Sequence, residues 1–203
     1  MCVTAPFCLA VGKPVDDVAL LDALKQRDSS VLAALFTRHA DALYRLAVRL
    51  LGDEQQADGV VQTAFLALLD HADRFEGRAN IGTWLYRVAY NECLMRLRAA
   101  PSVSLDDLAG ESGEFMPSCL VDWRNLPEEA LLNEEAHAEM ERAINSLTPT
   151  LRAVFTLRDV EELSVSETAH ILNLSEAAVK TNLHRARLHL RERLSRYFEG
   201  RHT

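Results

Sequence analysis

Hydrophobic residues recur at helical spacing along most of this chain. They lie three and four positions apart over residues 30–51, where the pair Gly52-Asp53 ends the stretch, and again over residues 60–72. The positions are Leu32, Leu35, Phe36, Leu43, Leu46, Ala47 and Leu50, then Val60, Val61, Ala64, Phe65, Leu68, Leu69 and Ala72. Two amphipathic helices are therefore predicted, and strand patterns are nearly absent.

A segment with two glycines, residues 75–82, separates the second helix from a third. We expect the third helix to begin near Thr83 as its N-cap and to run through Trp84 to Leu97. Three amphipathic helices joined by short connections predict a helical bundle as the first domain.

Residues 99–127 have a different composition. They contain Pro101, Pro117 and Pro127, two glycines and little periodicity, which is typical of a linker. Hydrophobic side chains are scattered among its acidic residues. The segment is either a solvated tether that docks a few residues on its own domains, or a stretch that lies along the surface of a partner.

A second helical block follows over residues 128–199. Its first helix is acidic and is predicted over Glu128–Ser146. Thr148-Pro149 suits the start of the next helix, because the N–H that proline lacks has no helical partner there. The remaining helices are predicted over Leu151–Val160, Ser166–Asn173 and Glu176–Phe198.

Residues 164–194, SVSETAHILNLSEAAVKTNLHRARLHLRERL, have the layout of a helix-turn-helix motif. Ser164 or Ser166 can cap the first helix. Asn173 stands at the turn, where a left-handed backbone is often needed and asparagine tolerates it. Ser175 is a good N-cap for the second helix.

The second helix of the motif separates into two faces. One face is apolar, and the other carries bases and hydrogen-bonding groups that suit the major groove of DNA. The alternative is a surface helix with a basic, solvated face. The apolar stripe is Val179, Leu183, Ala186, Leu190 and Leu194, and the polar stripe is Lys180, Thr181, His184, Arg185, Arg187 and Arg191.

Charge supports a division of the chain into two domains. The whole chain has a formal net charge of −8, which excludes a uniformly basic nucleic-acid binder. Residues 101–142 hold 2 bases and 11 acids, a net of −9, whereas residues 176–201 hold 7 bases and 3 acids, a net of +4. An acidic middle therefore separates a nearly neutral first part from a basic tail.

Several other classes of protein are disfavoured by the composition. No apolar run approaches the roughly 20 residues that a membrane-spanning helix needs, and the N-terminus lacks the basic start of a signal peptide. Four dispersed cysteines, including Cys2 and Cys8, do not form a disulfide framework, so a reducing cytoplasm is expected. No catalytic constellation, metal site or cofactor site stands out.

Taken together, these motifs resemble the extracytoplasmic-function sigma factors, the small two-domain specificity subunits of bacterial RNA polymerase. The segment ADGVVQTAFLALLDHADRFEGRANIGTWLYRVAYNECLMRLR resembles the domain that binds the polymerase clamp and reads the promoter −10 element. The stretch from SLTPTLRAVF to HLRERL resembles the −35 domain. The expected organisation is all-α: an extension over 1–15, a first domain over 16–98, a flexible acidic linker over 99–127 and a helix-turn-helix domain over 128–199.

The resemblance implies roles for individual residues of the first domain. Asp58, Val61, Gln62 and Phe65 match the clamp-binding helix, although Phe65 has core packing as an alternative role. Core packing is likewise the alternative role of Trp84, whereas Tyr86 and Arg87 are expected to point elsewhere on the helix. The matches to the −10 reading and strand-opening element are Arg78, Asn80, Trp84, Tyr86, Arg87 and Asn91.

In the second domain the resemblance implies −35 recognition by Lys180, Thr181, His184 and Arg185, with Ser175 and Arg187 on phosphates. The polymerase flap is expected to meet the apolar surface of this domain. The implied partners are core RNA polymerase, promoter DNA and an inhibitory anti-sigma factor, with no cofactor. The chain departs from the family pattern at Gly59, where an acidic residue is usual.

Two alternatives from other classes stay open at this point. A conventional helix-turn-helix regulator would bind duplex DNA alone as a dimer, although residues 77–98 argue against it. An adaptor would use both helical domains for protein contacts only, and charge reversal at Lys180 and Arg185 would leave transcription unchanged.

Overall fold

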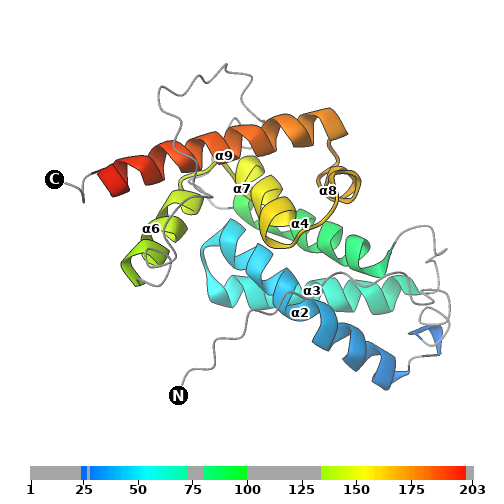
Figure 1. Cartoon of the computed structure of the whole chain (residues 1–203). Coiled ribbons are helices and arrows are strands. Elements are labelled where there is room, and N and C mark those ends of the chain that lie inside the picture. Colours follow the sequence, from blue (N-terminus) through cyan, green and yellow to red (C-terminus); the bar gives the residue numbers. More distant parts are fainter. Residues whose placement is uncertain (1–23, 27, 73–79, 100–133, 200–203) are drawn as a thin grey trace.

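The structure, a computed structural model, describes residues 24–26, 28–72, 80–99 and 134–199, in which every regular element is a helix. Figure 1 shows α9 running across one side of the molecule and α2 and α3 on the opposite side, with α4 between α9 and this pair. The all-α prediction is confirmed. The elements are α2 (Ser29–Leu51), α3 (Glu54–His71), α4 (Ile81–Ala99), α6 (Glu134–Asn145), α7 (Pro149–Phe155), a π-helical turn η4 (Thr156–Val160), α8 (Val165–Leu172) and α9 (Glu176–Glu199).

Several predictions fall outside the described residues. These are the extension over 1–15, the linker from residue 100 onward, the beginning of the acidic helix at Glu128, and Arg78.

The joint between α2 and α3 lies where the sequence predicts it. Gly52 adopts a left-handed conformation (φ 69°), and its N–H donates to the Val48 carbonyl to close α2. Asp53 then caps α3, because its Oδ1 accepts from the Gln56 N–H at 2.9 Å. A two-residue connection of this kind makes α2 and α3 neighbours.

The start of α4 differs from the prediction. Asn80, not Thr83, occupies the capping position: its Oδ1 accepts from the Gly82 N–H at 2.7 Å and its carbonyl accepts from the Trp84 N–H at 3.0 Å. Thr83 faces the interior. Gly82 lies close to His39 of α2, since a Cβ at position 82 would stand 2.9 Å from His39 Cε1. The helix therefore begins earlier, at the point where it meets α2.

The second block follows its predicted order with one difference. Thr148 and Pro149 start α7 as expected, but the helix predicted over Leu151–Val160 divides into α7 and the π turn η4. Glu162, two residues past η4, has a positive φ of 55°. The turn widens the helix before the chain enters α8.

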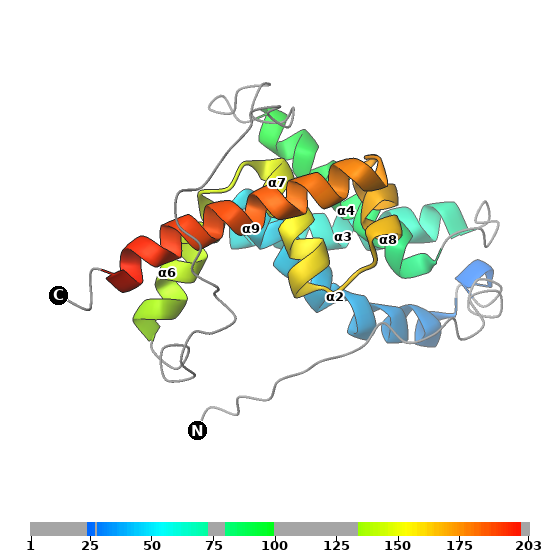
Figure 2. The same cartoon turned by 45° about the horizontal axis from the view of Figure 1, so that its top comes forward.

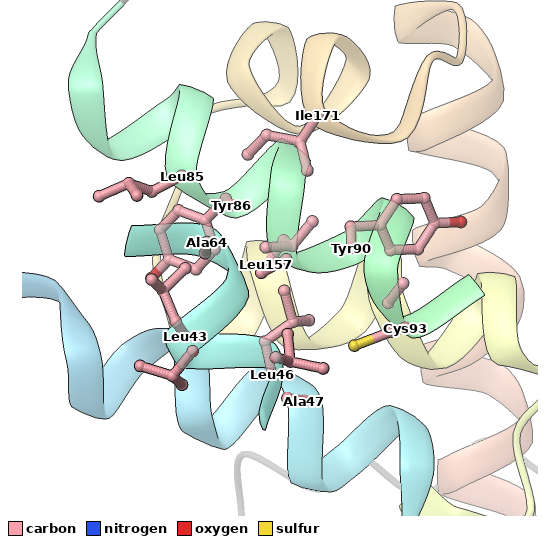
Figure 3. Close-up of a cluster of buried hydrophobic side chains, with 14 of the residues drawn as sticks. Leu43, Leu46, Ala47, Ala64, Leu85, Tyr86, Tyr90, Cys93, Leu157 and Ile171 are labelled. Carbon is pink, nitrogen blue, oxygen red and sulfur yellow. The ribbon is translucent and has the colours of Figure 1, made fainter. Parts of the chain in front are cut away.

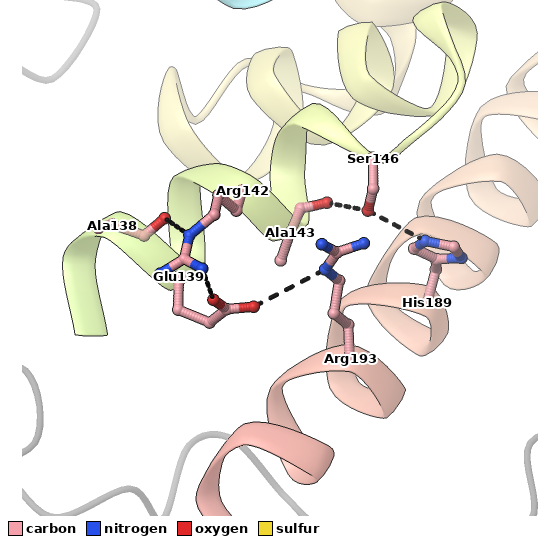
Figure 4. Close-up of polar contacts among 7 residues, drawn as sticks. All are labelled: Ala138, Glu139, Arg142, Ala143, Ser146, His189 and Arg193. Carbon is pink, nitrogen blue, oxygen red and sulfur yellow. Dashed lines mark hydrogen bonds and ion pairs between the residues drawn. The ribbon is translucent and has the colours of Figure 1, made fainter. Parts of the chain in front are cut away.

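Polar and apolar contacts join α6 to α9 (Figure 4). Ser146 donates to the Ala143 carbonyl at 2.6 Å and lies 3.3 Å from His189 Nε2. Glu139 pairs with Arg142 at 3.0 Å and with Arg193 at 3.8 Å. The apolar residues beneath these contacts are Ala143, Ile144, Leu147, Ala186, Leu190 and Leu194.

The larger core is continuous across both helical blocks. Figure 3 shows Leu43 and Leu46 of α2, Ala64 of α3 and Tyr86 of α4 in one cluster with Leu157 of η4 and Ile171 of α8. Figure 2 shows α8 lying over α4. The two domains are thus packed together, and the second domain buries much of its apolar surface against the first.

Two residues of the predicted apolar stripes are exceptions. Phe36 of α2 and Leu69 of α3 are exposed, while the remaining positions of those stripes are buried or partly buried. Phe36 covers Phe65, with ring centroids 4.9 Å apart. The stripes are wider than the area that the neighbouring helices cover.

We predict that His39 makes stability sensitive to acid. Burial, followed by the nearby charge of Arg38, lowers the pKa of His39 from 6.5 to about 4. Below pH 6.5 His39 therefore becomes protonated in the unfolded chain but stays neutral in the folded chain. The free energy of unfolding falls as the pH decreases from 6.5 to 4. Allowing for the partial exposure of the ring, the loss is about 1–2 kcal/mol.

Urea unfolding of the wild type and His39→Gln across pH 4–7.5 measures this effect. The variant lacks the titration, so the difference in stability between the two proteins should change over this window. A constant difference would contradict the assignment to His39.

Candidate DNA and polymerase contact surfaces

The helix-turn-helix is built by three local hydrogen-bonded caps. Ser164 and Glu167 form a capping box at the start of α8, with distances of 2.8 and 3.1 Å. Asn173 ends α8 in the left-handed region (φ 54°, ψ 45°), as predicted. Ser175 Oγ accepts from the Ala178 N–H at 3.1 Å and starts α9. The turn thereby fixes the direction in which α9 leaves α8.

The two faces of α9 are separated as the sequence predicts. Lys180, Thr181 and His184 are exposed and form a polar row, and Arg185 beside them is partly exposed. The Thr181 hydroxyl donates to the Ala177 carbonyl at 3.0 Å, which leaves its oxygen lone pairs available as acceptors. Every member of the predicted apolar stripe is buried: Val179, Leu183, Ala186, Leu190 and Leu194.

Arg187 is engaged within its own domain. Its guanidinium makes two hydrogen bonds to the Asp159 carboxylate, at 2.8 and 2.6 Å. These bonds raise the pKa of Arg187. The bidentate pair ties η4 to α9 and so helps to position α9, and the contact of Arg187 with phosphate stays a prediction.

The exposed face of α4 is a single stripe. An α-helix turns by about 100° per residue, so positions 84, 87, 91, 95 and 98 share one side. Arg87, Asn91 and Arg98 are exposed there, and Trp84 is partly exposed against His71, with ring centroids 6.2 Å apart. Met95, which sequence reasoning did not single out, is 58% exposed on the same side.

Tyr86 is not on this stripe. It follows Trp84 by two positions, which turns it about 200° away and into the shared core, where it is 5% exposed. Its hydroxyl donates to Glu161 Oε2 at 3.2 Å, and burial is the main cause of its raised pKa. Tyr86 points away from Trp84, as expected, but it is not accessible in this arrangement, and its contact with the −10 strand stays a prediction.

The exposed side of α3 differs in part from the expected clamp-binding set. Asp58 and Gln62 are exposed, as a binding helix requires, but Val61 and Phe65 are buried. Phe65 packs in the core, which is the alternative role that the sequence left open. The exposed stripe continues instead to Leu66, which is 61% exposed and lies one turn beyond Gln62. The sequence signal for this position is a leucine outside the apolar stripe of its own helix, one turn after Gln62.

Gly59 has a packing reason. A Cβ at this position would stand 2.9 Å from Arg96 Nη1. The Arg96 guanidinium lies over α3, donates to the Gln56 carbonyl at 2.5 Å and pairs with Glu92 at 2.8 Å. The glycine thus admits an arginine of α4 onto the backbone of α3.

In the described part of the chain, no group of three or more His, Cys, Asp or Glu side chains is arranged to hold a metal ion. None of the helices there is both long and apolar enough to cross a membrane.

Comparison with known families identifies both helical blocks. Residues 35–101 match Sigma-70 region 2, and residues 137–190 match Sigma-70, region 4. The chain is 34% identical over 173 residues to the ECF RNA polymerase sigma factor SigW of Bacillus subtilis (strain 168), covering 84% of this chain and 92% of that protein. It is 30% identical over 181 residues to the ECF RNA polymerase sigma-E factor of Escherichia coli (strain K12), covering 87% and 93%.

Two solved structures share the fold. The structure of CnrH in complex with the cytosolic domain of CnrY superposes with a TM-score of 0.63 at 24% identity, covering 88% of this chain and 97% of that one. The sigma factor RpoE from Bartonella quintana, in complex with the anti-sigma factor NepR, gives 0.60 at 21% identity, covering 80% and 96%.

We predict that Arg187 and Asp159 are energetically coupled. Arg187→Ala and Asp159→Ala should each lower stability, and their effects should fall short of additivity by roughly 0.5–2 kcal/mol because each change removes the same ion pair. Urea unfolding of the two single variants and the double variant measures the coupling. Additive losses would show that the guanidinium stabilises the domain by some other contact.

Proposed function

The chain belongs to the extracytoplasmic-function sigma factors, which bind core RNA polymerase and direct it to promoters, and we propose how its surfaces divide that work. The first domain, carried by α2–α4, docks on the polymerase clamp and holds the opened −10 strand. The second domain, carried by α6–α9, recognises the −35 element as duplex DNA. The observation that carries this proposal concerns α9, the second helix of the capped helix-turn-helix. One face of α9 exposes a polar row, and the other face buries the whole apolar stripe.

For −35 recognition we propose Lys180, Thr181, His184 and Arg185 as the groups that enter the major groove. Their row is presented by α9, and lysine and arginine can reach guanine edges or phosphates. Ser175, at the start of α9, lies where a phosphate can meet the free N–H groups of the first turn. The apolar surface of this domain is the proposed contact for the polymerase flap.

For the −10 element we propose Asn80, Trp84, Arg87 and Asn91, together with Arg78 outside the described residues. Arg87 and Asn91 lie on the exposed stripe of α4, where arginine can contact phosphates and the partly exposed Trp84 can stack on an unpaired base. Asn80 is engaged as the cap of α4, which places its backbone and amide at the entrance to the stripe.

For the polymerase clamp we propose the stripe of Asp58, Gln62 and Leu66 on α3. These residues combine two polar groups with an exposed leucine at successive helical turns, a pattern that fits a helix-to-helix contact. Val61 and Phe65 support the stripe from beneath by packing in the core.

Regulation and location are proposed on the basis of family membership. We propose that an anti-sigma factor binds this protein and holds it inactive; the solved sigma factor RpoE of similar fold is in complex with the anti-sigma factor NepR. We also propose that the chain acts in the cytoplasm as a dissociable subunit and catalyses no reaction of its own.

We predict that Lys180→Glu strongly reduces promoter-specific transcription while leaving the fold intact. A lost base or phosphate contact costs about 1–3 kcal/mol, and the introduced carboxylate adds repulsion, so transcript levels should fall at least about tenfold. The measurement is run-off transcription with purified core polymerase on a pool of genomic fragments.

Arg142→Glu is the matched control, because it makes the same charge change on α6 of the same domain. Transcripts should persist with this variant. Equal activity of the two variants would count against −35 recognition by α9 and favour the adaptor hypothesis.

We predict that Leu66→Glu weakens binding to core polymerase by roughly tenfold or more, because it buries a carboxylate where the wild type buries an apolar side chain. Met95→Glu introduces the same charge at a similarly exposed site on α4 and should bind core normally. Fluorescence anisotropy of labelled protein with core polymerase makes the comparison. Unchanged affinity of Leu66→Glu would place the clamp contact elsewhere.

A further inference from the structure

Two polar anchors join the domains across the shared core. In the first, Glu161 of the second domain accepts two hydrogen bonds from Arg45 of α2, at 2.9 and 2.8 Å, and one from the Tyr86 hydroxyl at 3.2 Å. In the second, Arg152 of α7 donates to the Arg49 carbonyl at the end of α2 at 2.9 Å. The two arginine contacts connect residues 116 and 103 positions apart in the chain, and the Tyr86 contact spans 75.

Of the two charged groups in the first anchor, Glu161 is the more buried. Its side chain is 5% exposed, whereas that of Arg45 is 49% exposed. A carboxylate taken out of water is tolerated only when its oxygens are paired, and here both oxygens accept from the first domain. Hydrogen bonds to Glu161 also raise the pKa of Arg45, which keeps the guanidinium charged.

The local backbone around Glu161 has two unusual features, a π turn and a left-handed residue. Glu161 directly follows the π turn, and its N–H donates to the Thr156 carbonyl at 2.9 Å. Glu162, the next residue, has φ 55°, a conformation that non-glycine residues adopt at a cost of about 1 kcal/mol or more. π turns and left-handed residues are concentrated at functional positions.

Arg152 contributes in a similar way through carbonyl groups. Besides the Arg49 carbonyl, its guanidinium donates to the carbonyls of Leu147, at 2.9 Å, and Asn145. These are the unpaired carbonyls at the end of α6 and, for Arg49, near the end of α2. One partly buried cation thus satisfies helix ends from both domains, and its desolvation lowers its pKa.

The packed arrangement cannot engage a promoter at both elements. Elements named for positions −35 and −10 lie about 25 base pairs apart, which is about 85 Å along B-DNA. The reading helix α9 has 24 residues, which makes it about 36 Å long, and its domain is in direct contact with α4. Residues 100–133, a stretch of 34 residues, can reach on the order of 115 Å when fully extended. Opening is therefore both required and permitted by chain length.

We propose that this chain closes on itself without any partner, and that Glu161 is the clasp, because it occupies the Arg45–Tyr86 pair of the first domain. Closure keeps the two DNA-reading surfaces too close together to be used on one promoter. Polymerase binding then has to separate the domains, which exposes the face of α4 that carries Tyr86. The functional consequence rests on the proposed division of promoter contacts; the closure itself does not.

The test measures opening directly, in the full-length chain. Donor and acceptor dyes are attached to cysteines introduced at the exposed positions Gln55 and Ser166, one in each domain, after the native cysteines are replaced. Single-molecule energy transfer without polymerase then gives the ratio of open to closed molecules. The wild type should be predominantly in one high-transfer state.

Glu161→Gln should raise the ratio of open to closed molecules by about tenfold or more, because the amide loses the ion pair and one acceptor oxygen. Tyr86→Phe should raise it less. Glu162→Gln is the matched control, since it makes the same change at the adjacent exposed residue and should leave the ratio unchanged. The charge swap Arg45→Glu with Glu161→Arg should restore closure and so separates loss of the clasp from misfolding.

A wild type that is mainly open would overturn the proposal, as would equal ratios for Glu161→Gln and Glu162→Gln or a charge swap that stays open. Adding core polymerase to the labelled wild type should shift it to low transfer. Because the measurement without polymerase involves no promoter, it can succeed even if the Lys180→Glu experiment refutes the −35 assignment, and it can fail even if that assignment holds.

Discussion

The two-sided burial of α4 is the constraint on which the rest of the structure depends. One side of this helix must pack against α2 and α3, and the side carrying Tyr86 packs under η4 and α8 of the second domain. Only the narrow stripe from Trp84 through Arg87 and Asn91 is left to face solvent. The position of every proposed −10 contact on α4, and the closed arrangement of the domains, follow from this division of one helical surface.

Local signals were sufficient for the elements, because their physical causes lie within a few residues. Gly52 ends α2, Asn173 turns in the left-handed region, and the apolar stripe of α9 is buried at all five predicted positions. The start of α4 was misjudged for a related reason. Asn80 and Thr83 are both good caps by residue type, and the choice between them depends on the contact of Gly82 with His39 from another helix.

The candidate sites were predictable only where exposure follows from one helix alone. Lys180 and His184 are exposed because α9 has a single buried face, whereas Tyr86 is buried by partners that the pattern of its own helix does not specify. Val61 and Phe65 lie on the apolar stripe that the pattern of α3 predicts, and only the family resemblance gave them a binding role. Arg187 illustrates the same limit for charge. A basic residue on a solvent-facing stripe suggests a phosphate contact, but Asp159, 28 positions earlier in the chain, already satisfies it. Gly59, a departure from the family pattern, becomes intelligible only beside Arg96.

The closed arrangement also links polymerase binding to domain separation in energetic terms. Among the described residues, the core that joins α6 and its following turn to α9 is a cluster of six buried side chains, while Leu157 and Ile171 are buried in the core shared with the first domain. Opening therefore exposes apolar surface on both domains and leaves Glu161 and Arg45 to be rehydrated separately. A partner can hold the open form only through contacts that the closed form lacks. While the closed form predominates, a change that weakens it and leaves the partner's contacts intact strengthens that partner's binding by the same free energy.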